Sequence, residues 1–531
     1  MTHDTIVIGS GPGGLVAALA LARRGQRVLV VEQHYLPGGW SHSFALGGYR
    51  FSPGIHYLGD LGAGQSLRRI LEGVGLSGEV DFCEMNPDAF DHFLIAGERF
   101  DVPKGFGPYL ARLLERFPDE RVGLLRYHQV LFQVLKEIRS VDSLLNFPEV
   151  LLVPFKAPAL LRWGFRSLGT LLDACVKDPM ARAVLTAQVG NHGLAPSQVS
   201  LGLHAAMHVH YHNGAFYPRG GAKRLPQAMI KVLRRHGGEI RVRARVDTIR
   251  IENGRATGVV LAGGEFLPAK NVISNADPHW LYTRLLPKAS RGGHERKARR
   301  MNYTFSCMSL FCAVDMDMRG RGFDSGNYWY YRHTDIDAIY KRAQLALPGD
   351  QLDVMFVSVP TLKDPEYRPN GHHLLEAFTF VPYAPFERWA GTHPDERDAG
   401  YAALKHKLGE QMLDTLEAMI PGVRASLKFH SVATPLANDF YCATVRGAVY
   451  GTAKTASQIG PLSFSIKTPV PNVFQCGAST FSHGYAGAAY SGIFAAARVL
   501  GEGSPMKLMS PMDNGIRVFP SEDPDSWVGH G

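Results

Sequence analysis

Two short apolar runs open the chain, with a longer alanine- and leucine-rich segment between them. The runs cover residues 6–8 and 28–31, which suits buried strands, and the segment between them has the length of a helix. The pattern predicts a strand, a turn, a helix and a second strand in succession, the building block of a parallel α/β sheet.

The turn that leads into this helix is rich in glycine. The glycines follow the pattern G-x-G-x-x-G at Gly9, Gly11 and Gly14. The first allows a tight turn, the second lets the backbone approach a pyrophosphate, and the third allows the helix to pack closely on the strand. Glu32 ends the second strand, where an acid can bind ribose hydroxyls. The unit therefore predicts a dinucleotide site with the anion at the helix N-terminus.

Similar patterns return between residues 212 and 277. A turn-rich stretch ends in the sequence YPRGG, residues 217–221, and leads into an amphipathic helix that Gly237-Gly238 ends. A hairpin turn is predicted at Asn253-Gly254. The strands predicted around it cover residues 240–242, 246–251, 256–261 and 271–277.

The remaining regions have other patterns. Residues 80–200 predict mostly amphipathic helices, and residues 300–430 predict three strands and one long helix. The helix breaks expected in the first region are Pro148, Pro154 and Pro158. The elements expected in the second region are strands over residues 305–314, 354–359 and 374–381 and a helix over 401–419, stopped by Pro421-Gly422.

We therefore expect an α/β fold in which a Rossmann-type dinucleotide-binding domain is interleaved with an α+β substrate domain. The first domain is expected to comprise residues 1–80, 205–300 and 465–500, and the second residues 81–204 and 301–464. The tail, residues 501–531, is rich in Gly, Pro, Ser and Asp, and we expect it to pack loosely or to be disordered.

Composition agrees with a cofactor-dependent globular enzyme. The six cysteines form no CxxC pair and have no metal-ligand spacing, so we expect a reduced, cytoplasmic setting and no metal. We expect no signal peptide, because the first strand begins by Thr5. We also find no uncharged apolar run long enough to span a bilayer.

The formal net charge of +9 raises the question of an anionic partner. The basic residues are distributed and lack a recognition motif, so we expect no nucleic acid. The densest basic run, residues 294–300, predicts a solvated helix face. Residues 149–172 mix long apolar side chains with cations and place Trp163 between Arg162 and Arg166. This segment predicts peripheral membrane contact through interfacial helices, or else helices packed on the protein's own core.

The residues after Glu32 extend the dinucleotide motif. Gly38 and Gly39 follow the acid at the start of the sequence GGWSHSF. This pair resembles the second signature of the FAD-dependent family that includes amine oxidases, phytoene desaturases and Rab escort proteins. The resemblance implies FAD as the cofactor, and we expect it to be bound without a covalent link, since no cysteine or histidine at the ring stands out by motif.

Other segments resemble particular branches of this family. YPRGG and the strand after it resemble the phytoene desaturases, in which a backbone at the position of Val246 contacts adenine. Gly477-Ala478 stands where amine oxidases usually have Gly-Asp, which resembles the carotenoid branch. Residues 47–59 and 433–451 look very like segments of the all-trans-retinol saturases. Ser52 departs from the pattern, since desaturases commonly carry aspartate there.

Motifs and resemblance together give a set of expected cofactor-binding residues. They are Gly9, Gly11, Pro12, Gly13, Gly14, Glu32, Gln33, Gly38, Gly39, Trp40, Ser41, His42, Val246, Asn275, Gly477, Ala478, Gly487 and Ala488. A small-residue helix start after residue 485 is expected to place further backbone N–H groups near an anion or a flavin carbonyl.

The resemblance implies an oxidoreductase that saturates or desaturates a carbon–carbon bond of a lipophilic polyene, such as a retinoid or a carotenoid. Two alternatives stay open: a carotenoid cis–trans isomerase that uses reduced FAD, and a lipid-binding escort without redox activity. Gly320-x-Gly322 lacks the helix and acid of a second dinucleotide site. The electron partner therefore enters the same cleft, or is a quinone, oxygen or another protein.

Candidates to give or take a proton flank the cofactor motifs. They are His56, Tyr57, His483 and Tyr485. The alternative for each is a packing residue or a contact to the flavin ring. A further cluster comprises His204, His208, His210 and His212. Since three of these have a period of two and no carboxylate is near, we expect a strand face near the active site rather than a metal site.

Overall fold

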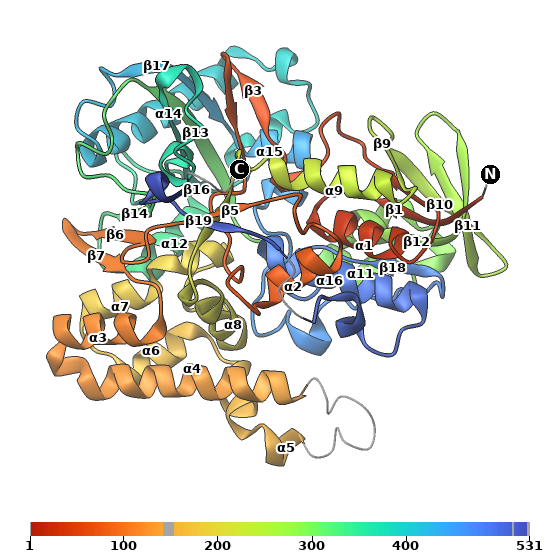
Figure 1. The fold of residues 1–531 in the computed structure, drawn as a ribbon, viewed down its shortest axis with the longest axis horizontal. Helices are drawn as coiled ribbons and strands as arrows, with labels where there is room; N and C mark the ends of the chain where they lie inside the picture. The colour runs from red at the N-terminus through yellow and green to blue at the C-terminus, as the bar shows by residue number, and fades with distance from the viewer. Residues whose placement is uncertain (1, 142–152, 512–514, 528–531) are drawn as a thin grey trace.

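The computed structural model describes residues 2–141, 153–511 and 515–527. Two seven-stranded sheets lie side by side, and a layer of helices lies below one of them (Figure 1). The first sheet has the strand order β10-β11-β12-β1-β2-β9, and β18 also pairs with β12. Its elements are β1 (His3–Ile8), β2 (Val28–Val31), β9 (Glu239–Arg241), β10 (Val246–Glu252), β11 (Arg255–Leu261), β12 (Phe266–Ser274) and β18 (Val473–Gln475).

The centre of this sheet is parallel, as the N-terminal pattern predicted. β1 pairs in parallel with both β2 and β12. Because side chains alternate along a strand, Val7 and Val30 pack on the helical side, while Ile6 and Leu29 pack towards β10 and β11. The predicted hairpin turn at Asn253-Gly254 joins β10 to β11.

Helices cover one face of the first sheet. All residues of α1 (Pro12–Ala22) except Pro12 are buried, and α1 packs against α16 (Gly484–Leu500) and α9 (Arg224–Arg235). The backbones of α1 and α16 approach so closely that a Cβ atom at Gly492 would lie 2.2 Å from the carbonyl oxygen of Gly13. The small side chains of both helices permit this contact, which brings two ends of the chain together.

The second sheet has the order β17-β13-β16-β15-β14-β6-β7. The three strands predicted from residues 300–430 are confirmed as β13, β15 and β16, and the predicted long helix as α14 (Ala399–Met419). One side of β13 packs on α14, while the other side faces a cavity. The strands are β6 (Asp91–Ile95), β7 (Glu98–Val102), β13 (Ser306–Val314), β14 (Asn327–Tyr331), β15 (Val354–Ser358), β16 (His373–Val381) and β17 (Leu427–Ala433).

The prediction of mostly helices over residues 80–200 is wrong at its start, where three strands occur. β6 and β7 form the edge of the second sheet, where β6 pairs with β14 and β7 pairs with β6. The local pattern does not reveal these strands, because β14 lies more than 200 residues further along the chain. Pro148 lies outside the described residues, Pro154 falls within α5, and Pro158 follows it. The elements of the helical layer are α3 (Phe106–Arg116), α4 (Arg121–Val141), α5 (Val153–Lys156), η4 (Leu160–Gly164), α6 (Leu168–Cys175), α7 (Pro179–Thr186), η5 (Ala187–His192) and α8 (Leu201–His212).

The expectation of a loose tail is also wrong for its described part. β19 (Val518–Pro520) pairs with β5 (Phe82–Glu84), which pairs with β8 (Phe216–Pro218). Phe519 and Trp527 are buried, and the guanidinium of Arg219 lies 4.6 Å from the Phe519 ring centroid. Two aromatic side chains therefore fix a segment whose composition suggested disorder.

The shorter elements complete the chain. The basic run at residues 294–300 forms a helix, as predicted. We propose the domain division that the sequence suggested. One addition is that β19, from the tail, joins β5 and β8 in a three-stranded sheet. Further elements are β3 (Phe44–Leu46), β4 (Tyr49–Phe51), α2 (Ser66–Gly73), α10 (Pro278–Trp280), η6 (Leu281–Leu285), α11 (His294–Arg300), α12 (Ile336–Leu345), α13 (Pro360–Lys363), α15 (Pro435–Cys442) and the short η1 (Gly39–Ser41).

Candidate active site

A cavity of about 690 Å³ extends from the carboxyl ends of β1, β2 and β12 to the second sheet. Ligand pockets in proteins are typically of this size. Most of the residues singled out from the sequence meet here. Those that line the cavity are Gly9, Gly11, Pro12, Glu32, Gln33, Gly39, Trp40, Ser41, His56, Val246, Asn275, Gly477, Ala478, Tyr485 and Ala488.

The glycine loop has the close packing that its motif predicted. Gly9 has a φ of 91°, which L-residues rarely adopt, and Gly11 precedes the first turn of α1. A Cβ atom at Gly14 would lie 2.1 Å from the carbonyl oxygen of Gly9, and one at Gly11 would lie 2.7 Å from Nδ2 of Asn275. The loop therefore presents bare backbone to the cavity at the N-terminus of α1, as an anion site requires.

Glu32 fastens this loop. Its Oε2 accepts hydrogen bonds from the backbone N–H and the hydroxyl of Ser10, at 2.8 and 2.5 Å, and its Oε1 accepts one from the backbone N–H of His34 at 2.8 Å. Ser10 Oγ in turn accepts a hydrogen bond from the N–H of Gly38 at 3.0 Å. Sequence reasoning missed Ser10, although its place between two motif glycines was a usable signal.

The glycine pair forms a second bare turn against the first. Gly38 and Gly39 have φ values of 124° and 55°, and a Cβ atom at Gly39 would lie 3.1 Å from Cα of Gly11. His42 does not line the cavity; its Nδ1 lies 2.6 Å from the carbonyl oxygen of Gly39, and burial lowers its pKa to about 4. Its observed contact is therefore with the turn.

The other expected cofactor residues outside the lining pack behind it. A Cβ atom at Gly13 would lie 2.8 Å from the carbonyl oxygen of Ala488, and one at Gly487 would lie 2.4 Å from that of Ser482. Gly14 packs against Gly9 in the first glycine loop, and Gly38 lies in the second glycine turn. On the cavity side, the N–H of Gly477 donates to Ser491 Oγ at 2.7 Å, which ties the loop after β18 to α16.

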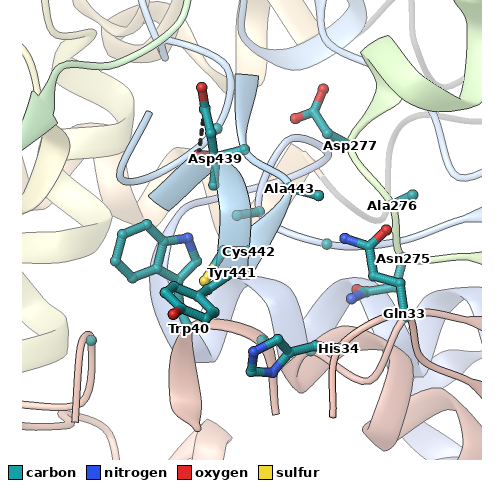
Figure 2. A pocket seen from close by; sticks show the side chains of 18 of the residues that line it. Gln33, His34, Trp40, Asn275, Ala276, Asp277, Asp439, Tyr441, Cys442 and Ala443 are labelled. Carbon is teal, nitrogen blue, oxygen red and sulfur yellow. Dashed lines mark hydrogen bonds between the residues drawn. The ribbon is translucent and has the colours of Figure 1, made fainter. Parts of the chain in front are cut away.

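Helix α15 and the loop after it close the cavity on another side. Figure 2 shows Tyr441 and Cys442 beside Trp40, with Asn275 and Gln33 further along the lining. The rings of Tyr441 and His34 meet edge to face, with centroids 5.4 Å apart. Sequence reasoning identified this segment only by its likeness to other proteins, not as part of the wall.

His56 is one of the two candidate proton donors that line the cavity. Its Nδ1 lies 3.1 Å from Oε2 of Glu376, a buried residue of β16. Its ring packs against both Phe356 and Phe378, with centroid separations of 5.3 and 5.6 Å, and these two rings stack on each other at 4.7 Å. Glu376 was not predicted, since a single acid within an apolar run gives no indication of its partner.

The other three candidates have different surroundings. Tyr57 is buried outside the lining and donates to Oδ2 of Asp91 at 3.3 Å; burial raises the pKa of both groups, that of Asp91 to about 6. His483 is also outside the lining, and burial lowers its pKa to about 3. Tyr485 lines the cavity, and its hydroxyl contacts Met229 Sδ at 3.7 Å.

Two buried lysines were missed because isolated lysines usually lie at the surface. Lys363 Nζ donates to the carbonyl oxygen of His56 at 2.5 Å, and Lys454 Nζ donates to that of Thr480 at 3.1 Å. Burial lowers the pKa of each amine to about 7. Both lysines thus hold backbone close to the cavity lining.

The histidine cluster does not form a strand face; that expectation is wrong. All four histidines lie on α8, where His204, His208 and His212 follow each other at a spacing of four residues on one buried face. His210 points elsewhere and accepts a hydrogen bond from the N–H of Gly59 at 3.2 Å. Within the described part of the chain no group of side chains has the arrangement of a metal site.

Known proteins resemble this chain over most of its length. The family described as flavin containing amine oxidoreductase matches residues 12–500. All-trans-retinol 13,14-reductase of Danio rerio is 30% identical, with 91% of this chain and 84% of that protein covered. Prolycopene isomerase of Daucus carota is 27% identical, with 94% and 80% covered. A solved oxidoreductase structure from Methanosarcina mazei has a TM-score of 0.64 at 19% identity, with 92% and 99% covered.

Proposed function

We propose a function from one premise: the chain belongs to the flavin containing amine oxidoreductase family. It is an FAD-dependent oxidoreductase, and the bare glycine turns, Glu32 and the cavity volume fit that cofactor. We propose that it saturates or desaturates a carbon–carbon bond of a lipophilic polyene of the retinoid or carotenoid kind, and that the FAD is bound without a covalent link. Relatives named for a retinoid and for prolycopene support this substrate class.

The observation that carries the proposal is the wall that the second sheet, α15 and the segment after α15 add to the flavin cavity. It is mainly apolar, and His56 is its ionisable imidazole. An apolar wall suits a conjugated hydrocarbon, which offers few polar groups to bind. This wall consists of Cys307 and Phe378 from the second sheet, Leu436 from α15, Val449 and Tyr450 from the segment after α15, and His56.

Saturation of a double bond needs a hydride at one carbon and a proton at the other. Reduced FAD, when bound, supplies the hydride. In this proposal His56 holds the proton, Phe356 and Phe378 fix the imidazole plane, and the apolar side chains exclude water from the reacting carbons. Desaturation uses the same groups in reverse, with His56 accepting the proton.

The isomerase remains the second candidate, because prolycopene isomerase matches the chain almost as extensively as the reductase does. An escort without redox activity is less well supported. Glu32 and the two glycine turns are intact, as a working FAD site requires.

The three functions differ in what happens to a polyene under anaerobic conditions. We expect the purified protein, with its FAD reduced by dithionite, to convert a retinoid or carotenoid to a product that is heavier by two hydrogens. An unchanged mass with a shifted absorption spectrum would indicate the isomerase. A protein that retains FAD but turns over none of the polyenes would contradict both enzymatic proposals.

We further propose that the helical layer meets a membrane surface. Phe155, Leu161 and Phe165 are exposed, with Phe155 83% accessible. Trp163 lies beside both cations, as the sequence suggested, since the guanidiniums of Arg162 and Arg166 lie 5.3 and 5.5 Å from its ring centroid. The indole itself is buried, which agrees with the alternative of packing on the protein's own core for this side chain. No described helix is long and apolar enough to cross a bilayer.

This proposal predicts salt-sensitive binding to anionic vesicles at low ionic strength. Cations near such a surface each contribute about 1 kcal/mol, and inserted apolar side chains contribute more. We expect co-sedimentation to fall at least roughly tenfold in Arg162→Glu/Arg166→Glu and in Phe155→Ser. Arg296→Glu/Arg300→Glu on α11 is the matched control for charge alone. A parent protein that stays in the supernatant, or equal losses in the control, would refute this contact surface.

A further inference from the structure

A buried carboxylate lies beside the proposed proton donor. All nine residues of β16 are buried, and Glu376 is one of them, with 2% of its surface accessible. A carboxylate in such a place is strongly destabilising unless its oxygens are paired. Oε1 accepts a hydrogen bond from the backbone N–H of Ser52 at 2.6 Å, and Oε2 lies 3.1 Å from Nδ1 of His56.

Lys363 completes the group at the backbone of His56. Its Nζ donates to the carbonyl oxygen of His56, to Asn327 Oδ1 and to Ser358 Oγ, at 2.5, 2.5 and 2.6 Å. The ammonium is attracted to both Glu376 and Asp91. Lys363 therefore holds the backbone of His56, and Glu376 holds its imidazole ring.

From this geometry we propose that Glu376 is a positioning residue for His56, an inference that rests on the proposed function. The carboxylate binds the Nδ1–H group, which fixes the ring orientation and leaves Nε2 as the nitrogen available to the cavity. It also stabilises the imidazolium form, so that Nε2 carries a transferable proton. None of the sequence motifs pointed to this residue.

The proton balance of the step is simple. During saturation the π bond of the substrate breaks, one carbon gains a hydride from reduced FAD, and the other gains the proton from Nε2 of His56. His56 becomes neutral with its remaining proton on Nδ1, facing Glu376, and regains a proton at Nε2 from water. Reduced FAD is oxidised and the polyene is reduced by two electrons.

Other titratable groups lie around His56 and Glu376 and influence the pH dependence of this pair. Two of them are Lys363 and Asp91, which attract each other. Two more are Tyr217, from β8, and Tyr367. Burial raises the pKa of both phenols, and the negative charge of Glu376 raises it further. At neutral pH both tyrosines are therefore uncharged, and the charges acting on His56 come from Glu376, Lys363 and Asp91.

The test is Glu376→Gln, which keeps the size of the side chain and an oxygen for the Ser52 N–H group. We expect single-turnover oxidation of the reduced flavin by polyene to slow by roughly 10- to 100-fold at neutral pH. The pH at which the rate falls should move to lower values, because the neutral amide no longer stabilises the imidazolium. FAD content and reduction by dithionite should remain as in the parent.

Two comparisons separate positioning from a merely structural role. In a His56→Phe background, Glu376→Gln should slow the reaction less than twofold further, because residues that act as a unit are not additive. Glu137→Gln, a buried carboxylate in the helical layer that accepts the backbone N–H of Leu160, is the matched control and should leave rate and pH profile unchanged. Multiplicative losses in the double variant, or an unmoved pH profile, would overturn the proposal.

A second measurement does not depend on turnover. With ring-15N histidine, the signal assigned to His56 by its loss in His56→Phe should show a proton on Nδ1 in the parent and mixed tautomers in Glu376→Gln. A parent that turns over no polyene but shows this change would refute the proposed function and leave the positioning intact. An identical tautomer in both proteins would refute the positioning.

Discussion

Glu32→Ala is expected to weaken FAD binding by roughly 10²- to 10³-fold, the largest loss from any single change in the cofactor site. The alanine removes the carboxylate expected to bind the ribose. It also removes the partner of the Ser10 N–H and hydroxyl and of the His34 N–H. Hydrogen bonds to a charged group contribute about 1.5–3 kcal/mol each, and about 1.4 kcal/mol corresponds to a tenfold change in Kd. Flavin fluorescence quenching on titration of the apoprotein measures the effect.

Glu265→Ala is the control for this change. Glu265 lies in the same domain, but its ion pair with Arg241 is exposed, and its loss should leave the Kd for FAD within about twofold. Glu32→Gln should lie between the parent and the alanine variant, because an amide retains one acceptor oxygen. Parent-like affinity in Glu32→Ala would show that the glycine turns hold the dinucleotide without the acid.

The second large effect is expected for His56→Phe, which should reduce kcat by roughly 10²- to 10⁴-fold with FAD still bound. Phenylalanine can pack against Phe356 and Phe378 as the imidazole does, so the wall should keep its shape. The proposed proton donor is lost, and Glu376 is left without its imidazole partner. Anaerobic single-turnover kinetics with a polyene, together with the flavin content of the protein, give both quantities.

His430→Phe serves as the control, because His430 is exposed on β17 of the same sheet. It should retain the parent kcat. Full activity in His56→Phe would identify His56 as a packing residue of the wall and would direct attention to Tyr485, the other candidate that lines the cavity.

The parts of the fold that could be predicted are those whose signal is local. β1, α1 and β2 follow from a contiguous apolar pattern and three spaced glycines, and β13, β15 and β16 follow from apolar runs. β6 and β14 were missed because they contain polar residues whose hydrogen-bond partners lie on the neighbouring strand, far away in the sequence. Asp91 in β6, for example, accepts a hydrogen bond from Asn327 in β14 at 2.9 Å. The tail was mispredicted because two aromatic side chains outweigh its composition.

The candidate site divides in the same way. The glycine turns and Glu32 were predicted from the first 40 residues, and the structure brings them together with Asn275 and Gly477. Glu376 and Lys363 could not be predicted, because a buried charge is tolerated only beside its partner, and here the partner of each is His56, more than 300 residues earlier. The α8 histidines show the opposite error, in which three even-numbered positions suggested a strand although the helix spacing of four was also present.

The close contact of α1 with α16 has a consequence for biosynthesis. About 480 residues separate Gly9 from Ala488, although both line one cavity. At typical translation rates of about 5–20 residues per second, the ribosome needs roughly 25 to 100 seconds to reach Ala488 after it has added Gly9. For roughly the first half of that time β1 also lacks its neighbour β12, which comprises Phe266–Ser274. A nascent chain therefore cannot form its complete flavin cavity, and full cofactor retention must await almost the last helix to leave the ribosome.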